Sequence, residues 1–274
     1  MRMRTRPRLL IASWLSLWLA HATAAGPAPD PFEGDPFQSY QWVDMRKEYL
    51  GATAKAVFDE RVQVRGPAFA EDPMNVPITV SVKDLPGVDR IVVLVDRNPI
   101  RKVLEYQPMS ALPSVSFRFK LEQASPVRAA ARTADGVWHV GGTLVDSAGG
   151  GCTVSGATRK DGSWTQTLGL VSARVFDATP VPGESTAASG LLGSRLRLKV
   201  MHPMDTGLVG GVPAFYVNRL SVRDAQDKEL LRLQTFEPVS ENPVFSFDFP
   251  VKPAGALRIV GTDNNGNRID ATLE

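Results

Sequence analysis

The sequence has 274 residues, with 31 basic and 29 acidic side chains and a single cysteine. This length is enough for two modest domains. One cysteine excludes an internal disulfide, and the near balance of charge gives no reason to expect a nucleic-acid partner.

The first 25 residues predict a secretory signal peptide. An apolar run from Leu9 to Ala20 precedes the small-x-small cleavage signal Ala22-Thr23-Ala24. Four arginines form the basic region before the run: Arg2, Arg4, Arg6 and Arg8. The run is shorter than the roughly 20 residues of a transmembrane helix, so we expect cleavage, no membrane span and a periplasmic protein, with an uncleaved anchor as the alternative. Cleavage leaves 27 basic residues against 29 acidic ones.

After a proline-rich leader, the pattern changes from helix to strands. Trp42–Leu50 has helical spacing and stops at Gly51, which predicts a short helix. Short alternating or apolar segments then predict β-strands, and Ala134-Asp135-Gly136 predicts a hairpin turn. The predicted strands are Val62–Val64, Val76–Val82, Ile91–Val95, Ser114–Leu121 and Val137–Val140.

The same pattern occurs twice along the chain. Val88–Ile91 recurs as Val217–Leu220, and Ser116–Phe119 recurs as Ser246–Phe249, at offsets of 129 and 130 residues. Such a repeat predicts two copies of one β-sandwich domain. The fold class is therefore all-β, with two sandwich domains joined by a linker and a short N-terminal helix.

The repeat also sets the domain boundaries. The first sandwich covers residues 37–155 and the second residues 190–274, with a connecting segment and linker at 156–189. Within that segment, a helix at Ser163–Leu170 and a strand at Leu170–Phe176 both remain open, and Thr179–Gly190 has the composition of a linker.

The only cysteine, Cys152, follows three consecutive glycines, Gly149, Gly150 and Gly151. Glycine lacks a Cβ and is conformationally permissive, so this run predicts a flexible arm. A single thiol in an exported protein suggests intermolecular pairing or a reactive group. We expect Cys152 to be exposed and functional, with a buried, inert cysteine as the alternative.

These features resemble a fusion of SoxY and SoxZ, the sulfur-carrier pair of bacterial thiosulfate oxidation. The first half is similar to SoxY in its Val76–Val80 strand, its Phe117–Phe119 strand and its glycine-flanked Cys152. The second half is similar to SoxZ in His202–Gly207, supported by Asn242-Pro243 and the closing Thr262-to-Gly266 hairpin. The family it resembles most is the quinoprotein dehydrogenase-associated SoxYZ-like carriers.

The resemblance implies two immunoglobulin-like sandwiches and a sulfur intermediate carried covalently on Cys152, without catalysis and without another cofactor. It implies an interdomain contact formed by His202, Pro203, Met204 and Gly207. The implied partners are periplasmic redox proteins: Sox-type enzymes, a quinoprotein dehydrogenase or a c-type cytochrome. Thr153 and Val154 stand where the family's Gly-Gly-Cys-Gly-Gly tail has glycines, and here the cysteine is internal.

Three alternatives remain. The protein is a non-covalent accessory or assembly factor, in which the thiol is incidental. It is a Cys-His hydrolase, which requires His139 or His202 beside Cys152. His202 with Met201 and Met204 forms a soft-metal site. We expect no catalytic residue and no metal, and the oligomeric state stays open.

Overall fold

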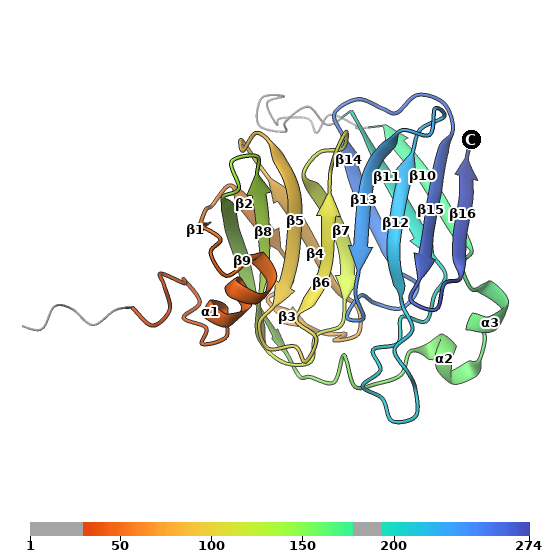
Figure 1. Cartoon of the computed structure of the whole chain (residues 1–274). Helices are drawn as coiled ribbons and strands as arrows, with labels where there is room; N and C mark the ends of the chain where they lie inside the picture. The colour runs from red at the N-terminus through yellow and green to blue at the C-terminus, as the bar shows by residue number, and fades with distance from the viewer. Residues whose placement is uncertain (1–29, 178–192) are drawn as a thin grey trace, which may run out of the picture. The chain divides into compact units, whose positions relative to one another are not determined.

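A computed structural model describes residues 30–177 and 193–274, and residues 32–274 form one compact unit of two β-sheets (Figure 1). The predicted signal peptide and the predicted linker Thr179–Gly190 lie outside the described residues. Among those described, no helix has the length and apolar character needed to cross a membrane.

The predicted N-terminal helix is confirmed. It consists of α1 (Trp42–Met45) and a π-helical turn η1 (Arg46–Leu50), and it ends at Gly51, whose φ of +120° favours glycine. Trp42, Met45 and Leu50 pack on the outer face of strands in the first half, forming a small second core.

Alternating apolar residues form the strands of the first half, because every second side chain points into the core. These strands are β1 (Ala56–Phe58), β2 (Val62–Arg65), β3 (Phe69–Ala70), β4 (Val76–Val82), β5 (Val88–Val95), β6 (Lys102–Gln107), β7 (Ser114–Phe119), β8 (Ser125–Thr133) and β9 (Trp138–Ser147).

The connecting segment contains both structures that the sequence left open. Two short helices, α2 (Ala157–Asp161) and α3 (Trp164–Thr167), precede strand β10 (Val171–Asp177). The second half then repeats the strands of the first as β11 (Ser194–Val200), β12 (Val217–Arg223), β13 (Glu229–Thr235), β14 (Val244–Phe249), β15 (Leu257–Asp263) and β16 (Arg268–Leu273).

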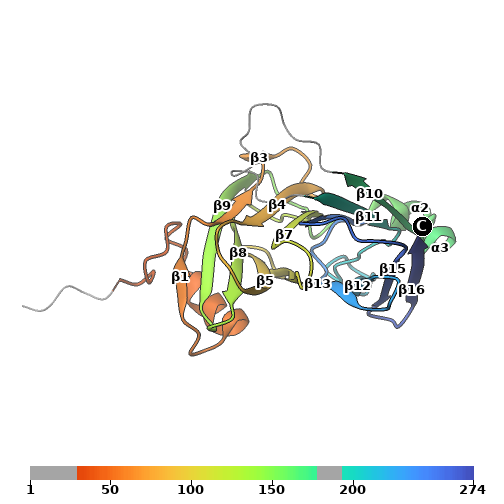
Figure 2. The same ribbon diagram turned by 90° about the horizontal axis from the view of Figure 1, so that it is seen from above.

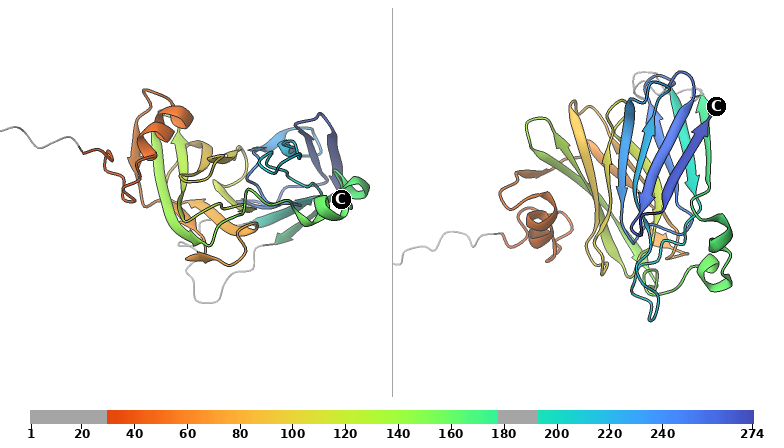
Figure 3. Two further views of the ribbon diagram at one scale, coloured as in Figure 1. Left: turned by 90° about the horizontal axis from the view of Figure 1, so that it is seen from below. Right: turned by 45° about the vertical axis from the view of Figure 1, so that its right-hand side comes forward.

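The two sheets pack face to face, as Figures 2 and 3 show from other sides. The ten-stranded sheet has the order β1-β9-β8-β5-β6-β13-β12-β15-β16, with β3 also paired to β9. The six-stranded sheet has the order β10-β11-β14-β7-β4-β2. Both sheets therefore run without interruption from the first half into the second.

Equivalent strands of the two repeats pair at this junction. In the six-stranded sheet, β7 and β14 are antiparallel and Ser116 lies opposite Ser246, its own equivalent at an offset of 130 residues. In the ten-stranded sheet, β6 and β13 are antiparallel, with Leu104 opposite Thr235 and Glu105 opposite Gln234. An antiparallel pairing of equivalent strands centred on equivalent positions is a local twofold axis, so the halves are related by pseudo-twofold symmetry.

The all-β sandwich class is confirmed, but the repeats do not keep separate cores. One hydrophobic cluster takes in residues of both halves and both sheets. Within it, the rings of Tyr106 from the first half and Phe247 from the second lie 5.4 Å apart between centroids. The contact between the halves is therefore a continuous core rather than a contact between two finished domains.

Candidate functional site

Cys152 lies where the two halves meet, five residues after β9 ends, and its side chain is fully buried. The expectation of an exposed thiol is wrong for this conformation. The flanking glycines and polar residues argued against burial, but two segments distant in sequence cover the sulfur: residues 120–122 after β7 and the loop around Thr206.

Polar contacts from both halves hold Cys152. Its Sγ donates to the carbonyl of Lys120 at 3.5 Å, and its backbone N–H donates to Glu122 Oε2 at 2.9 Å. Its own carbonyl accepts a hydrogen bond of 2.7 Å from Thr206 Oγ1 in the second half. Thr153 Oγ1 adds a bond of 3.1 Å to Glu122 Oε1. The thiol therefore occupies a polar, enclosed position rather than an apolar core.

The three glycines lie in a closed position against the first half, outside any strand. Gly150 N donates to Glu122 O and Gly151 N to Leu121 O, both at 3.2 Å. A Cβ at Gly151 would come within 2.2 Å of Pro73 O and 2.6 Å of Leu121 O, so only glycine fits there. In this conformation the predicted arm is held in place by its close backbone packing.

Lys120 is the cation beside the thiol. Its side chain is 2% exposed, and its Nζ donates to the carbonyl of Met204 in the second half. Burial lowers the pKa of Lys120, while the charges of Cys152, Asp205 and Glu241 act in the opposite direction. Lys120 thus links the arm of the first half to the His202–Gly207 loop of the second.

The position keeps the thiol protonated. Burial raises the pKa of Cys152 to about 12, the Glu122 carboxylate contributes further, and the positive charge of Lys120 only partly offsets them. Because the thiolate is the nucleophile, Cys152 is unreactive at neutral pH while it occupies this position.

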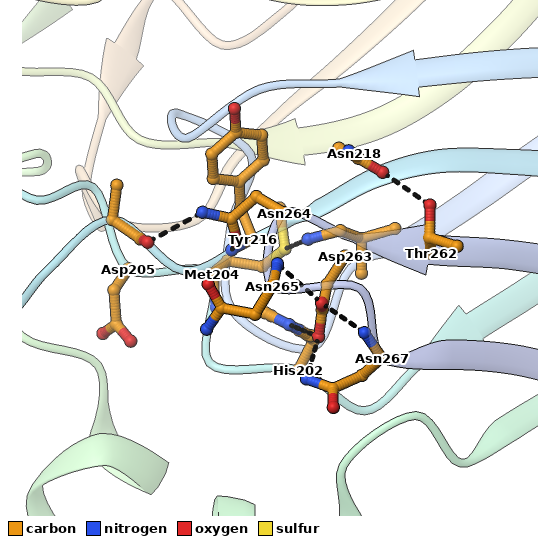
Figure 4. Close-up of polar contacts among 12 residues, drawn as sticks. His202, Met204, Asp205, Tyr216, Asn218, Thr262, Asp263, Asn264, Asn265 and Asn267 are labelled. Atoms are coloured by element: carbon orange, nitrogen blue, oxygen red, sulfur yellow. Dashed lines mark hydrogen bonds and ion pairs between the residues drawn. The ribbon is translucent and has the colours of Figure 1, made fainter.

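The His202–Gly207 loop is shaped within the second half (Figure 4). His202 Nδ1 accepts the backbone N–H of Met204 at 3.1 Å, so the proton of the neutral ring lies on Nε2. That nitrogen is 3.5 Å from Asp263 Oδ2 and makes no hydrogen bond. The ring packs against Phe215 at 4.3 Å between centroids. Burial lowers the pKa of His202 to about 4 against a smaller opposing effect of Asp263.

Asp263 in turn closes the β15–β16 hairpin. Its Oδ1 accepts the backbone N–H groups of Asn265 and Asn267, and its Oδ2 accepts the side-chain amide of Asn267 (Figure 4). His202 and this predicted hairpin therefore form one packed unit, which positions Met204 toward Lys120.

The segment after the thiol is docked onto the second half. Glu241 accepts the backbone N–H groups of Ala157 and Thr158, at 2.8 and 2.7 Å. Arg159 pairs with Asp205, and its guanidinium stacks 4.2 Å from the Trp164 ring. The arm is therefore anchored at both ends.

Of the four residues predicted at the interdomain contact, Met204 reaches the first half through its carbonyl. Pro203 is buried, and Gly207 is exposed with a φ of +77°. Sequence reasoning missed Lys120, Glu122 and Thr206. Lys120 falls on the outward phase of the β7 alternation, and no local signal marks it as buried.

The two histidines are placed apart from the thiol's contacts. His139 Nδ1 lies 2.7 Å from Asp59 Oδ2, and His202 contacts residues of its own half. No hydrogen bond joins either ring to Cys152 in the described part of the chain, which removes the basis for a Cys-His hydrolase. The described residues contain no group of three His, Cys, Asp or Glu side chains placed to hold a metal.

Comparison with known families agrees with this two-part organisation. Residues 46–152 match the family described as sulfur oxidation protein SoxY, and residues 190–274 match sulphur oxidation protein SoxZ. The chain is a SoxYZ-like fusion. The SoxY match ends at Cys152, so the thiol occupies the C-terminal end of the SoxY half.

Solved structures similar to the SoxYZ-like chain include two proteins of low identity. One is the sulfur carrier protein SoxY from Chlorobium limicola f thiosulfatophilum, at 19% identity and a TM-score of 0.34, covering 39% of this chain and 96% of that one. The other is a superoxide reductase (neelaredoxin) from Ignicoccus hospitalis, at 15% identity and a TM-score of 0.29, covering 38% and 90%. A search of curated proteins found no match.

Proposed function

We propose that this SoxYZ-like fusion is a periplasmic carrier that holds a sulfur-containing intermediate covalently on Cys152 and presents it to partner redox enzymes. The observation that carries the proposal is the position of the single cysteine. It ends the region that matches SoxY, follows three glycines and contacts the SoxZ half through Thr206. The protein has no resolving cysteine, so a partner has to complete any exchange.

The closed position of the arm gives this carrier two states. In the closed state the thiol is protonated and covered, which protects it from oxidation. Loading requires the arm to leave the Lys120–Glu122 segment. Each hydrogen bond lost contributes roughly 1 kcal/mol net, whereas a micromolar protein complex supplies about 8 kcal/mol. A partner that binds the open arm therefore has enough free energy to expose the thiol.

The chemistry also requires an electron acceptor. If thiosulfate is loaded, an S–S bond forms between Cys152 Sγ and the terminal sulfur, and the thiol proton and two electrons are released. The carrier has no redox group of its own besides this thiol among its side chains. The two electrons then pass to the partner, for which a Sox-type enzyme, a c-type cytochrome or a quinoprotein dehydrogenase system has the appropriate chemistry.

Mass spectrometry of protein isolated from its native periplasm tests the carrier function. We expect a mass increase on the peptide containing Cys152, removed by dithiothreitol, in cells oxidising a reduced sulfur compound. A Cys152 that stays unmodified under those conditions would argue against a carrier.

Burial of the thiol favours a second candidate, a non-covalent accessory or assembly protein of a periplasmic redox system. Cys152→Ser separates the two, because serine is similar in size and its hydroxyl can still donate to the Lys120 carbonyl. A carrier loses the function of its pathway with this substitution, whereas an accessory protein retains it.

A further inference from the structure

The outer face of the six-stranded sheet carries a concentration of positive charge. Alternation along each strand points one set of side chains into the core and the other set outward. Five of the outward side chains are basic, and we call them the basic face: Arg65, Arg118, Arg174, Arg197 and Lys199. All except Lys199, which is partly buried, are exposed.

Strand register aligns much of this charge. Arg174 of β10 lies directly opposite Arg197 of β11. The row continues across β14, β7 and β4 to Arg65 of β2, through three hydroxyl side chains: Ser246, Ser116 and Thr79. No acidic residue interrupts the row. Like charges directly opposite each other on an antiparallel pair are destabilising, so the fold does not account for them.

The described structure provides no carboxylate for the basic face. The two acidic residues along these six strands are already paired, Asp248 with Arg195 and Asp177 with Lys252. The outer face of the ten-stranded sheet is different, because five ion pairs balance its charge. The two faces come from the same repeat, so unpaired charge is a property of this face rather than of the fold.

The shape of the basic face fits a protein surface. Two shallow depressions of about 160 and 220 Å³ meet at Arg197 and Val244. Both are smaller than the roughly 300 Å³ at which small-molecule sites begin. One of them contains Ser116 and Ser246, which lie on the pseudo-twofold axis.

We propose that the basic face is a docking surface for an acidic protein partner. The arginine guanidiniums are matched in geometry to carboxylates, and unpaired charge on one face steers a partner of opposite charge. Arg118 lies two residues before Lys120, whose carbonyl accepts the thiol of Cys152, so a partner seated here lies beside the end of β7 that holds the arm. The role of this partner in loading or unloading rests on the proposed carrier function; its binding does not.

Binding of poly-L-glutamate, as an acidic polypeptide probe, tests the proposal on the whole mature protein. We expect calorimetry at 20 mM salt to show a complex that weakens at least tenfold at 200 mM salt. Replacing Arg174 and Arg197 by glutamine should weaken binding at least tenfold at 20 mM salt. The matched control replaces Lys228 and Arg268, two basic residues off this face, by glutamine with the same change of net charge, and should change affinity less than threefold.

Zero-length carbodiimide coupling locates the probe, because Lys199 offers an amine within the basic face. We expect Lys199 to be a principal site of coupling to polyglutamate. Equal losses in the two double variants, or coupling only to lysines elsewhere, would overturn the proposal. Binding confined to a DNA oligonucleotide or to phosphatidylglycerol vesicles would overturn it too. Because Cys152→Ser should bind polyglutamate normally, failure of docking is distinguishable from failure of the carrier function.

Discussion

The reactivity of Cys152 is decided by three neighbours rather than by its glycines. Lys120 provides a carbonyl and a positive charge, Glu122 a carboxylate, and Thr206 a hydroxyl. Two of these influences suppress the thiolate, namely enclosure and the Glu122 charge. The site in its closed form is therefore built to hold a thiol, not to activate it.

Glu122→Gln should make Cys152 more reactive. Glutamine removes the negative charge that contributes to the raised pKa, and it also weakens the bond to the Cys152 N–H. We expect faster alkylation by iodoacetamide and a pKa below about 12 but still above the ordinary range, because burial is the larger cause. The pH dependence of alkylation measures both.

Glu60→Gln is the control, since Glu60 is exposed in the turn before β2 and makes none of the contacts of Cys152. An unchanged pH profile in Glu122→Gln would show that the carboxylate does not control the thiol.

His202 makes the fold sensitive to acid. Its pKa is about 4 in the folded protein and near 6.5 when unfolded, so the unfolded state binds more protons between these values. The stability contributed by the neutral ring is complete above pH 6.5 and is lost progressively as the pH falls toward 4. Urea unfolding at pH 7 and pH 5 should show a loss that is smaller in His202→Gln. An equal loss in both proteins would assign the sensitivity to carboxylates.

At the scale of elements, a buried ion cluster holds the N-terminal segment on the sheet. Arg128 of β8 makes paired hydrogen bonds to Asp35 and Asp96, at 2.6 to 2.8 Å, with all three side chains at most 1% exposed. Its guanidinium also lies 4.9 Å from the Phe37 ring and 4.7 Å from the Trp42 ring. The segment before α1 is therefore fixed by charge as well as by apolar packing.

Arg128→Met should be strongly destabilising, because it leaves two buried carboxylates without a partner. Breaking a buried pair in this way typically costs about 3–5 kcal/mol. Arg132→Met on the same strand is the matched control, since its pair with Asp89 is exposed and contributes about 0–1 kcal/mol. Urea unfolding measures both, and equal free-energy changes would contradict a structural role of the cluster.

At the scale of the whole molecule, the pseudo-twofold junction makes two repeats into one folding unit. The β6–β13 and β7–β14 pairs carry both sheets across the axis, and one core lies between them. The site depends on this junction, because the arm of one half is covered by a loop of the other.

The mature protein should unfold in a single cooperative transition. Trp42 and Trp138 report on the first half, while Trp164 lies 5.7 Å from Phe215 of the second. Fluorescence of Trp164→Phe, and of the variant with phenylalanine at positions 42 and 138, should give coincident transitions after correction for any common shift in stability. Two separated midpoints would show that the halves fold independently.

Local patterns sufficed for several features. Alternation placed the strands, Gly51 marked the end of the helix, and the repeat at 129 to 130 residues anticipated the equivalence of β5 with β12 and β7 with β14. Where two local signals overlapped, at 163–176, the sequence alone left helix and strand open, and the structure contains both, because each occupies only part of the segment.

The sequence by itself determined the all-β class, the duplication and the placement of one cysteine behind three glycines, because these depend on residues near each other in the chain. Only the tertiary structure decided that the thiol is covered and that the halves share their sheets. Burial of Cys152 depends on Lys120 and Thr206, and continuity of the sheets depends on edges more than 100 residues apart. Contacts at such separations leave no periodic signature in a single sequence, so packing alone establishes them.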